Sequence, residues 1–427
     1  MEELDLVVVG AGLSGLTAAY YASKAGLGVL VLERGDVAGS KNLSGGRLYL
    51  GPLRGLVDEL LEGLCLERKV VVEKISVMGR QGSSTLSLRH DVLGQPQYES
   101  KTVLRARLDS HLSERVAQAG GFVVPQKKVD SLLKEGGRVV GIRSDGEEIR
   151  AKVVILAEGV LGLLSKEVGM HSPPLPKEAA TALKEVIQLP VEAIQARFGV
   201  GEGQGVAHLF VGWLTSGVAG GGFLYTNIDS VSLGLVLRLE DLMQTEVRPH
   251  ELLESFKARE EIACLLEGGR LVEYGAHMIP EARRLPPRDL VGDGYLIVGD
   301  AAGFSLNMGL TVRGMDMAMA SGYFASQAVI QAWQRKDFSA SCLGSYLEML
   351  KNSFVMKDLE RFAPVESLLS KKRLYTKYPE LICEALGGLF AVGPGQKEGY
   401  LKTIKRSMSH GPGISGWLKD LWDMRKI

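Results

Sequence analysis

Two apolar runs near the N-terminus flank a segment with helical spacing. Leu4–Val9 and residues 28–32 are continuous and rich in β-branched side chains, which is typical of buried parallel strands. Residues 16–25 between them are rich in alanine and stop before Gly26, which predicts a helix that ends at a glycine. The chain is therefore expected to begin with a strand–helix–strand unit.

Further elements are predicted by alternation for strands and by three- to four-residue spacing for helices. Strands are expected in a small antiparallel segment at 76–98, in a β-rich region at 195–239, and at 295–298. A hairpin is expected to join 138–143 to 147–156, with its turn at Asp145 and Gly146. Helices are expected at 103–119, 252–266 and 315–335, and over most of the last eighty residues.

Composition limits what these elements can build. A chain of 427 residues is too long for one simple core and suits two or three lobes. The formal net charge is zero, so no global field favours nucleic acid as a partner. The 53 glycines exceed the average share of about 7%, which indicates tight turns or backbone that lies close to a ligand.

The cysteines give no sign of a disulfide framework or a metal site. The four of them, Cys65, Cys264, Cys342 and Cys383, lie far apart and lack ferredoxin spacing. A reduced cytosolic setting is expected, with no cluster held by this chain alone. The N-terminus lacks a basic signal-peptide region, and the apolar residues 206–225 contain five glycines, so we expect sheet there instead of a membrane span.

The first chemical motif is a phosphate-binding fingerprint. Gly10, Gly12 and Gly15 lie between the first strand and its helix, where they permit a tight turn, close approach of a pyrophosphate and close helix packing. Glu33 ends the second strand, where a carboxylate can bind ribose hydroxyls. An ordinary glycine-rich turn is the alternative. The unit predicts a bound dinucleotide and leaves FAD and NAD open.

The second motif follows the strand expected at 295–298. Gly299 and Asp300 are followed by Ala301, Ala302 and Gly303. This is similar to flavoproteins of the glutathione-reductase structural superfamily, in which such an aspartate binds the ribityl chain of FAD. Asp300 could instead cap a helix. After a dinucleotide fingerprint, the resemblance favours FAD.

Four segments extend the resemblance over essentially the whole chain. The chain resembles the FixC and electron-transfer-flavoprotein:quinone oxidoreductase family in the order and spacing of residues 39–49, 220–225, 275–281 and 299–316. The family implies an oxidoreductase that takes electrons from the α and β subunits of an electron-transfer flavoprotein and passes them through FAD towards a quinone. The chain lacks cluster-spaced cysteines, so a [4Fe-4S] cluster is expected only in a separate ferredoxin-like, FixX-type subunit. Whether such a complex bifurcates electrons stays open.

The resemblance also implies site residues, carried over position by position. Those expected to bind FAD are Gly10, Gly12, Gly15, Glu33, Arg34, Lys41, Asn42, Ser44, Gly45, Gly46, Arg105, Asp300, Gly309, Leu310 and Thr311. Gly220 and Gly221 are expected to line the quinone channel with their backbones.

No residue stands out as a catalytic acid or base, because flavin carries the difficult chemistry. His277 could relay a quinone proton, with a structural histidine as the alternative, and His208 is equally ambiguous. Arg313 could stabilise reduced flavin or dock a partner, with a salt bridge as the alternative. Residues 397–427 carry seven basic and three acidic residues, which could dock an acidic ferredoxin or contact an anionic bilayer. We expect a cytoplasmic protein, peripheral at the inner face of the cell membrane.

Two segments depart from the family pattern. The loop that usually reads Ala-Asp-Gly has Glu158 in place of the aspartate. Glu281 is followed by Ala282, Arg283 and Arg284 where the family commonly has glycines. The alternative function is a geranylgeranyl-reductase-like flavoenzyme that reduces prenyl double bonds. An aromatic hydroxylase of similar fold is disfavoured by Glu158.

These expectations define a fold. We predict a mixed α/β (α+β) protein with a glutathione-reductase-type Rossmann FAD-binding domain, an inserted β-rich quinone domain and a helical C-terminal region. The FAD-binding domain is expected at 1–75, 100–172 and 270–345. The β-rich domain is expected at 76–99 and 173–269, and the helical region at 346–427.

Overall fold

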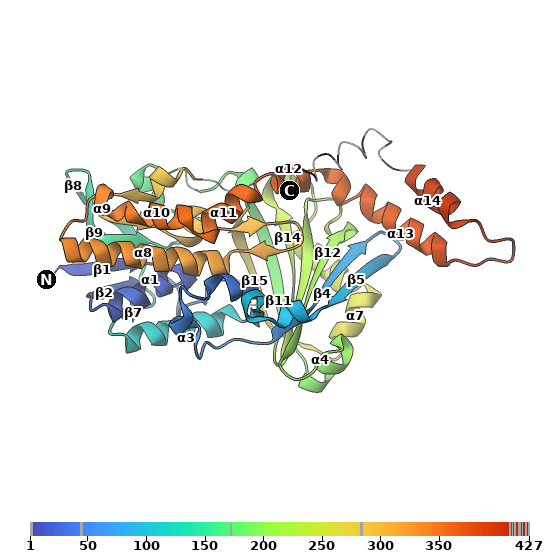
Figure 1. Cartoon of the computed structure of the whole chain (residues 1–427), viewed down its shortest axis with the longest axis horizontal. Coiled ribbons are helices and arrows are strands. Elements are labelled where there is room, and N and C mark those ends of the chain that lie inside the picture. The colour runs from blue at the N-terminus through green and yellow to red at the C-terminus, as the bar shows by residue number, and fades with distance from the viewer. Residues whose placement is uncertain are drawn as a thin grey trace.

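A computed structural model shows two large sheets arranged along the long axis of the molecule (Figure 1). The residues that the structure describes are 3–42, 46–170, 173–281 and 285–409, with Gly411, Gly413, Gly416, Asp420, Trp422 and Arg425. The mixed α/β class is confirmed, and helices follow the second sheet at the C-terminal end of the chain.

The first sheet is built around parallel strands. Its order is β16-β17-β10-β1-β2-β7, and β8 and β9 join it through β10. The strands are β1 (Leu4–Val9), β2 (Val29–Leu32), β7 (Phe122–Val124), β8 (Val129–Glu135), β9 (Arg138–Ser144), β10 (Glu147–Leu156), β16 (Val291–Gly292) and β17 (Tyr295–Ile297). Parallel strands that are buried on both faces explain the continuous apolar runs in β1 and β10.

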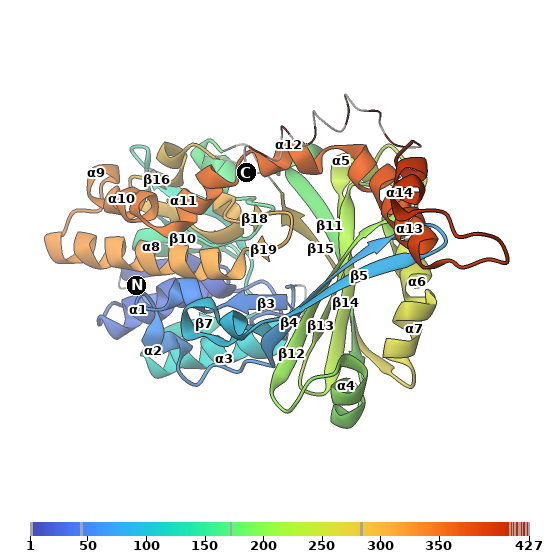
Figure 2. The same cartoon turned by 45° about the vertical axis from the view of Figure 1, so that its right-hand side comes forward.

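Three helices pack around the first sheet. They are α1 (Leu13–Lys24), α3 (Arg105–Gln118) and the long α8 (Met315–Arg335), whose predicted bounds are confirmed. Helices α1 and α8 lie in close contact, since a Cβ on Gly322 would be only 2.1 Å from the Ser14 carbonyl oxygen. The short α2 (Asp58–Leu61) also belongs to this half of the molecule (Figure 2).

The second sheet is the larger of the two. Its order is β15-β11-β14-β13-β12-β4-β6-β3, with β5 paired to β4. The strands are β3 (Gly46–Tyr49), β4 (Lys69–Met78), β5 (Ser83–Arg89), β6 (Ser100–Val103), β11 (Ala179–Gln188), β12 (Gln204–Gly212), β13 (Gly220–Thr226), β14 (Ser230–Arg238) and β15 (Arg270–Pro280). A separate hairpin joins β18 (Leu306–Asn307) to β19 (Val312–Arg313).

One face of the second sheet carries its own hydrophobic core. Helices α4 (Val191–Phe198), α6 (Pro249–Lys257) and α7 (Glu260–Leu266) cover this face, with the short α5 (Leu239–Leu242) at one end (Figure 2). The prediction of one helix at 252–266 was wrong, because the backbone of Arg259 is extended between α6 and α7. The Arg259 guanidinium binds the carbonyl oxygens of Gly79 and Gly82 at the β4–β5 turn, which favours the break.

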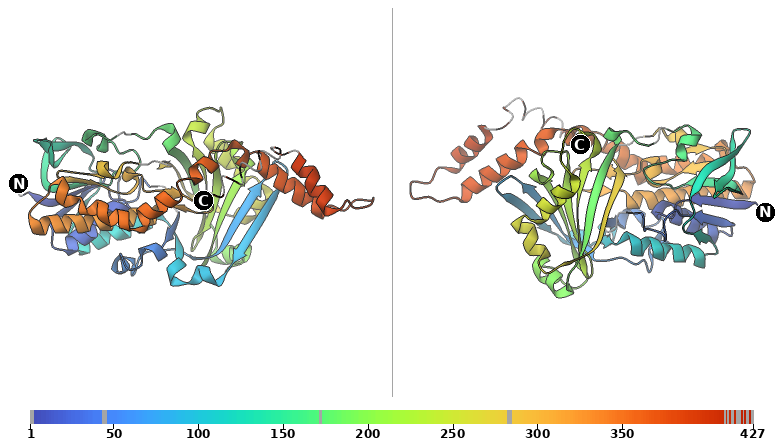
Figure 3. Two further views of the ribbon diagram at one scale, coloured as in Figure 1. Left: turned by 45° about the horizontal axis from the view of Figure 1, so that its top comes forward. Right: turned by 180° about the vertical axis from the view of Figure 1, so that it is seen from behind.

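The C-terminal helices divide into two groups. Helices α9 (Ala340–Leu343), α10 (Ser345–Asn352), α11 (Phe354–Arg361) and α12 (Val365–Leu369) run along the body, whereas α13 (Lys377–Phe390) and α14 (Tyr400–Ser409) form an arm that extends away from it (Figure 3). Across the described ranges, no helix has both the length and the apolarity that a membrane span requires. Residues 206–225 form sheet and a short turn, as expected.

The sheets do not follow the predicted domain limits residue by residue. Strands β3 and β15 and most of β4 belong to the second sheet, although the proposed FAD-binding domain includes 1–75 and 270–345. The domain boundaries remain a prediction.

Candidate functional site

The turn between β1 and α1 is shaped by glycines. Gly10 has φ of +106°, and a Cβ there would be 2.4 Å from the Ala157 carbonyl oxygen. A Cβ on Gly15 would be 2.1 Å from the Gly10 carbonyl oxygen, so larger residues cannot replace either glycine without displacing backbone. The first turn of α1 has no side-chain cap, and its N–H groups are available to an anion.

Glu33 connects the end of β2 to this turn. One carboxylate oxygen accepts a hydrogen bond from the Ala11 N–H at 2.9 Å, and the other accepts one from the Gly35 N–H at 2.7 Å. Each oxygen keeps a second lone pair for a ribose hydroxyl. Arg34 is exposed beside it.

A polar triad borders the space above Gly12. The Asp109 carboxylate, on α3, accepts hydrogen bonds from both Arg105 and Asn42 at 2.7–2.9 Å. A Cβ on Gly12 would lie 4.0 Å from the side-chain nitrogens of Arg105 and Asn42. Two donors are thereby held where a pyrophosphate would approach the glycine turn. Lys41 is exposed on the same loop, whereas Ser44 and Gly45 lie outside the described residues.

Asp300 follows β17 at a neighbouring position. No side chain caps the short turn Gly299–Ala302, so the alternative role of Asp300 as a cap is not observed. Burial raises the pKa of the Asp300 carboxyl, and the nearby Arg105 opposes this rise. Arg105 therefore links the first and second sequence motifs electrostatically.

The turn between β18 and β19 contains the three residues expected near the flavin ring. Gly309 has φ of +87°, and its N–H donates to the Asn307 side chain at 2.9 Å. The Met308 N–H donates to the Thr311 carbonyl at 2.9 Å, and Leu310 is exposed at the tip. The turn is an ordered loop that presents backbone to its surroundings.

The second sheet has another face, opposite the one that packs against α4, α6 and α7. In one row across its strands, Gly275, Lys184, Gly234 and Phe223 are aligned by strand pairing. In the next row towards β4, Tyr225 and Glu73 flank Ala207. The Phe223 and Tyr225 rings stack at 5.3 Å.

The row at Glu73 continues into a buried polar cluster. Arg47 forms an ion pair with Glu73 at 2.5 Å, and its guanidinium lies 4.5 Å from the centre of the Tyr49 ring. Burial raises the pKa of Tyr49 to about 12 and that of Tyr225 well above its usual range. Both phenols therefore remain protonated at neutral pH and can donate hydrogen bonds.

Gly220 and Gly221 begin β13. Gly220 has φ of +152°, and a Cβ on it would be 2.0 Å from the Val236 carbonyl oxygen. A Cβ on Gly221 would be 2.6 Å from the Phe210 carbonyl oxygen. Close backbone packing accounts for both glycines, and their expected contact with a quinone remains a prediction.

His277 lies on β15 opposite Ala182, on the same face as Lys184. Burial, Arg105 and Arg34 together lower the pKa of the His277 imidazole, so it is neutral at neutral pH. His277 thus contributes a neutral ring close to the two arginines of the cofactor side. Its proton-relay role remains a prediction.

Arg313 is held by carboxylates of the same chain. Its guanidinium, which is 8% exposed, donates to Asp316 at the start of α8 and to Asp358 on α11. The Phe354 ring lies 5.1 Å away. This geometry fits the salt-bridge alternative, and a role of Arg313 in stabilising flavin or docking a partner remains a prediction.

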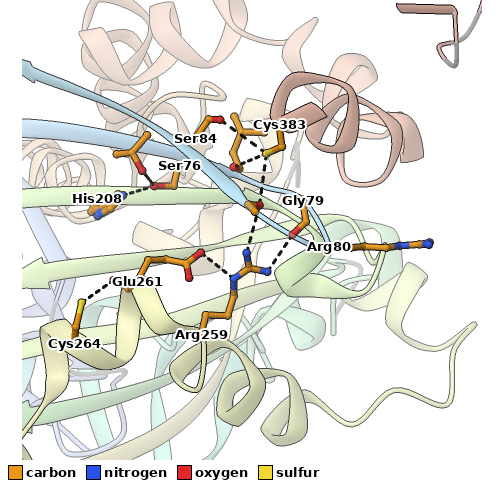
Figure 4. A network of polar contacts seen from close by, with 12 residues as sticks. Ser76, Gly79, Arg80, Ser84, His208, Arg259, Glu261, Cys264 and Cys383 are labelled. Carbon is orange, nitrogen blue, oxygen red and sulfur yellow. Dashed lines mark hydrogen bonds and ion pairs between the residues drawn. The ribbon is translucent and has the colours of Figure 1, made fainter. Parts of the chain in front are cut away.

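His208 belongs to the face of the sheet that the helices cover. Its Nε2 lies 2.7 Å from the Ser76 hydroxyl, and its ring stacks on Phe210 at 3.9 Å (Figure 4). Burial, with a smaller effect from Lys74, lowers the pKa of His208 to about 3. This neutral, packed imidazole fits a structural role.

The Glu158 departure has a local explanation. Its carboxylate accepts hydrogen bonds from the Leu164 N–H, the Ser165 N–H and the Ser165 hydroxyl at 2.6–2.7 Å. The longer side chain therefore caps the next turn. The second departure, Ala282 to Arg284, lies outside the described residues.

Sequence reasoning missed two side chains of this site. Asp109, which orients Arg105, is fully buried one helical turn after it, and that spacing was a readable signal. Lys184 is 2% exposed on β11, next to the buried Glu185, and nothing in the local sequence indicated its place on the sheet.

The described residues fit FAD. They combine a glycine turn with a free helix end, a ribose-binding carboxylate, and a triad that points two donors at the same space. Bound FAD would supply the two-electron chemistry, while the protein supplies binding, orientation and electrostatics. The individual contacts with FAD remain predictions.

Comparisons with known proteins agree with this geometry. A family model described as "FAD dependent oxidoreductase" matches residues 5–89, and one described as "ETF-QO, ubiquinone-binding" matches residues 180–279. A geranylgeranyl bacteriochlorophyll reductase-like protein from Thermoplasma acidophilum has a similar structure, with a TM-score of 0.71, 22% identity and coverage of 99% of this chain and 100% of that chain. At that identity the similarity shows the fold alone.

Two curated relatives from Escherichia coli (strain K12) are similar over nearly their full lengths. The "Probable electron transfer flavoprotein-quinone oxidoreductase YdiS" is 42% identical over 98% of this chain and 97% of its own. "Protein FixC" is 39% identical over 97% of both chains. The chain therefore belongs to the FixC and electron-transfer-flavoprotein:quinone oxidoreductase family, and it is an FAD-dependent oxidoreductase.

Proposed function

We propose that this protein accepts electrons from an electron-transfer flavoprotein and passes them through FAD to a quinone. The observation that carries this proposal is the match of the ubiquinone-binding family model to residues 180–279. That range spans β11 to β15 of the second sheet.

The start of β13 offers a fitting place for a quinone head. Gly221 lies on the same face of β13 as the stacked Phe223 and Tyr225 rings, whereas Gly220 belongs to the other face. A flat aromatic head can lie along such a surface, with backbone groups as hydrogen-bond partners. The protonated Tyr225 phenol is available as a donor nearby.

An iron–sulfur cluster, where the pathway uses one, would come from a separate ferredoxin-like subunit. The four cysteines are free thiols, and the described part of the chain contains no group of side chains suited to a metal ion.

The α13–α14 arm is the proposed contact with a membrane surface. Phe390 and Leu401 near its tip are 84% and 78% exposed, and Lys402, Lys405 and Arg406 add positive charge. Exposed apolar side chains with adjacent cations suit an anionic bilayer. Leu401→Asp should reduce binding to anionic vesicles without changing the FAD content, and unchanged vesicle binding would exclude the arm.

One anaerobic experiment tests the main proposal. The FAD-loaded protein is mixed with the reduced two-subunit electron-transfer flavoprotein, and the flavin absorbance is followed before and after a soluble quinone is added. We expect bleaching followed by recovery. No bleaching, together with reduction of an isoprenoid by dithionite-treated enzyme, would favour the prenyl reductase. Transfer to ferredoxin and quinone at the same time, with NADH as donor to the whole complex, would establish bifurcation.

A further inference from the structure

A buried lysine lies in the middle of strand β11. Lys184 is 2% exposed, and its neighbour Glu185 points to the opposite, helix-covered face, where it forms an ion pair with Lys257 of α6 at 2.9 Å. Because side chains alternate along a strand, Lys184 points to the other face of the sheet, away from helix α6.

Two glycines flank Lys184 on that face. The residues paired with it on the two neighbouring strands are Gly275 on β15 and Gly234 on β14. The Phe223 ring occupies the space over Gly234, since a Cβ there would be 2.5 Å from this ring. The Lys184 Nζ lies 6.0 Å from the centre of the same ring. Lys184 is thus flanked by a glycine on each neighbouring strand, with the Phe223 ring close by on the same face.

The charges around Lys184 belong to the cofactor side as well as to the sheet. Burial lowers the pKa of Lys184 well below its usual value, Glu273 of β15 opposes this effect, and Arg105 of α3 adds to it. Arg105 also acts on His277 and Asp300. Lys184 is therefore in electrostatic reach of the groups that border the predicted FAD site.

We propose that Lys184 is the charge that stabilises reduced FAD relative to oxidised FAD and so raises the reduction potential of the cofactor. Reduction by two electrons with uptake of one proton leaves one more negative charge on the flavin. A cation inside a site of low dielectric constant interacts strongly with that charge. An added negative charge also favours the ammonium form of Lys184, so the effect persists whichever form the lysine has beforehand.

The test is the reduction potential of the FAD-loaded protein, measured by equilibrium titration against a reference dye with dithionite as reductant. Lys184→Met should lower the equilibrium constant for reduction about tenfold, which is about 30 mV for a two-electron couple. Lys184→Arg retains a cation and should keep the constant within about threefold of the wild-type value.

Lys257→Met is the matched control. It removes a partly buried lysine next to the same strand but on the helix-covered face, and its potential should match that of the wild type. Lys184→Met keeps a side chain of similar length at the buried position, and its FAD content is measured before the titration. Should it fail to bind FAD, the arginine variant and Lys184→Gln provide the comparison.

Three outcomes would overturn the proposal. They are an unchanged potential in Lys184→Met, an equal fall in Lys184→Arg or Lys257→Met, and weaker binding of oxidised FAD without a change in potential. The last would make Lys184 a phosphate contact. The measurement needs neither a quinone nor a flavoprotein donor, so its failure would leave the proposed function standing.

Discussion

The two sheets present chemistry in different ways. At the end of β1, the first sheet presents backbone groups to a ligand. Gly10, Gly12 and Gly15 let the ligand approach, and the N-terminal end of α1 supplies N–H groups. The second sheet offers side chains, in rows that cross several strands, of which the row through Lys184 is one. The first kind of site is compact in sequence, and the second is assembled from distant segments.

This difference determines what holds each half of the site in place. The backbone site depends on glycines, so a single added methyl group can abolish ligand binding there. Side-chain chemistry depends on charges held in a buried place, so its sensitivity is electrostatic. The following predictions separate the two kinds of dependence.

The largest effect is expected at the glycine turn. Gly10→Ala should abolish retention of FAD and lower the free energy of unfolding by about 3 kcal/mol, because the new Cβ would collide with the Ala157 carbonyl oxygen at 2.4 Å. The flavin absorbance of the purified protein and urea unfolding measure the two effects.

Gly26→Ala is the control for backbone strain alone. Gly26 also has a positive φ, +88°, but a Cβ there would meet nothing within 4 Å. Gly26→Ala should lower the free energy of unfolding by about 1 kcal/mol and leave FAD bound. If both variants lost FAD equally, strain and not close approach would explain the turn.

Asp109→Asn should destabilise the protein without abolishing FAD binding. It leaves the buried Arg105 without its carboxylate, at a cost of about 3–5 kcal/mol in urea unfolding of the FAD-free protein. The loss should be smaller with FAD bound, because the pyrophosphate can pair with Arg105. Asp145→Asn, in an exposed ion pair, should have no measurable effect. If Asp109→Asn lost the same free energy of unfolding with and without FAD, the triad would not interact with the cofactor.

The success of sequence-based prediction follows the same division. The β1 turn, Glu33 and Asp300 were identifiable because each follows a buried strand within a few residues. Lys184 was not, because its significance depends on Gly234 and Gly275, which come from separate strands and meet it only through sheet pairing. Cross-strand registers are set by tertiary packing, and no local pattern reports them.

The break between α6 and α7 has a similar cause. Residues 252–266 have helical spacing throughout, yet Arg259 is extended because its guanidinium reaches the carbonyl oxygens of the β4–β5 turn. That partner lies about 180 residues earlier in the chain. Long-range hydrogen bonds of this kind override local propensity.

His208 should make stability depend on pH. Its pKa is lowered to about 3 in the folded protein, against 6.5 for an ordinary histidine, so the unfolded chain binds a proton that the folded one does not. Its contribution to stability is complete above pH 6.5 and is lost as the pH falls towards 3, at about 1.4 kcal/mol per pH unit.

His208→Gln should flatten this slope without changing the flavin reduction potential, because the residue lies on the helix-covered face. Urea unfolding between pH 7 and pH 4 measures the slope. His90→Gln, at an exposed histidine, is the control and should retain it. A shift of the flavin potential in His208→Gln would show that the two faces of the sheet are electrostatically connected.

The smallest effect is expected at Glu158, whose side chain binds backbone N–H groups in the half of the molecule that contains the first sheet. Glu158→Asp shortens the carboxylate by one methylene, so it can no longer reach both the Leu164 and Ser165 N–H groups. We expect a loss of about 1–2 kcal/mol in thermal unfolding, with FAD content unchanged. Glu158→Gln keeps the length but loses one charged acceptor, and should cost a similar amount. If the aspartate variant were as stable as the wild type, the turn after β10 would not need this cap, and the glutamate would have to be explained through the cofactor.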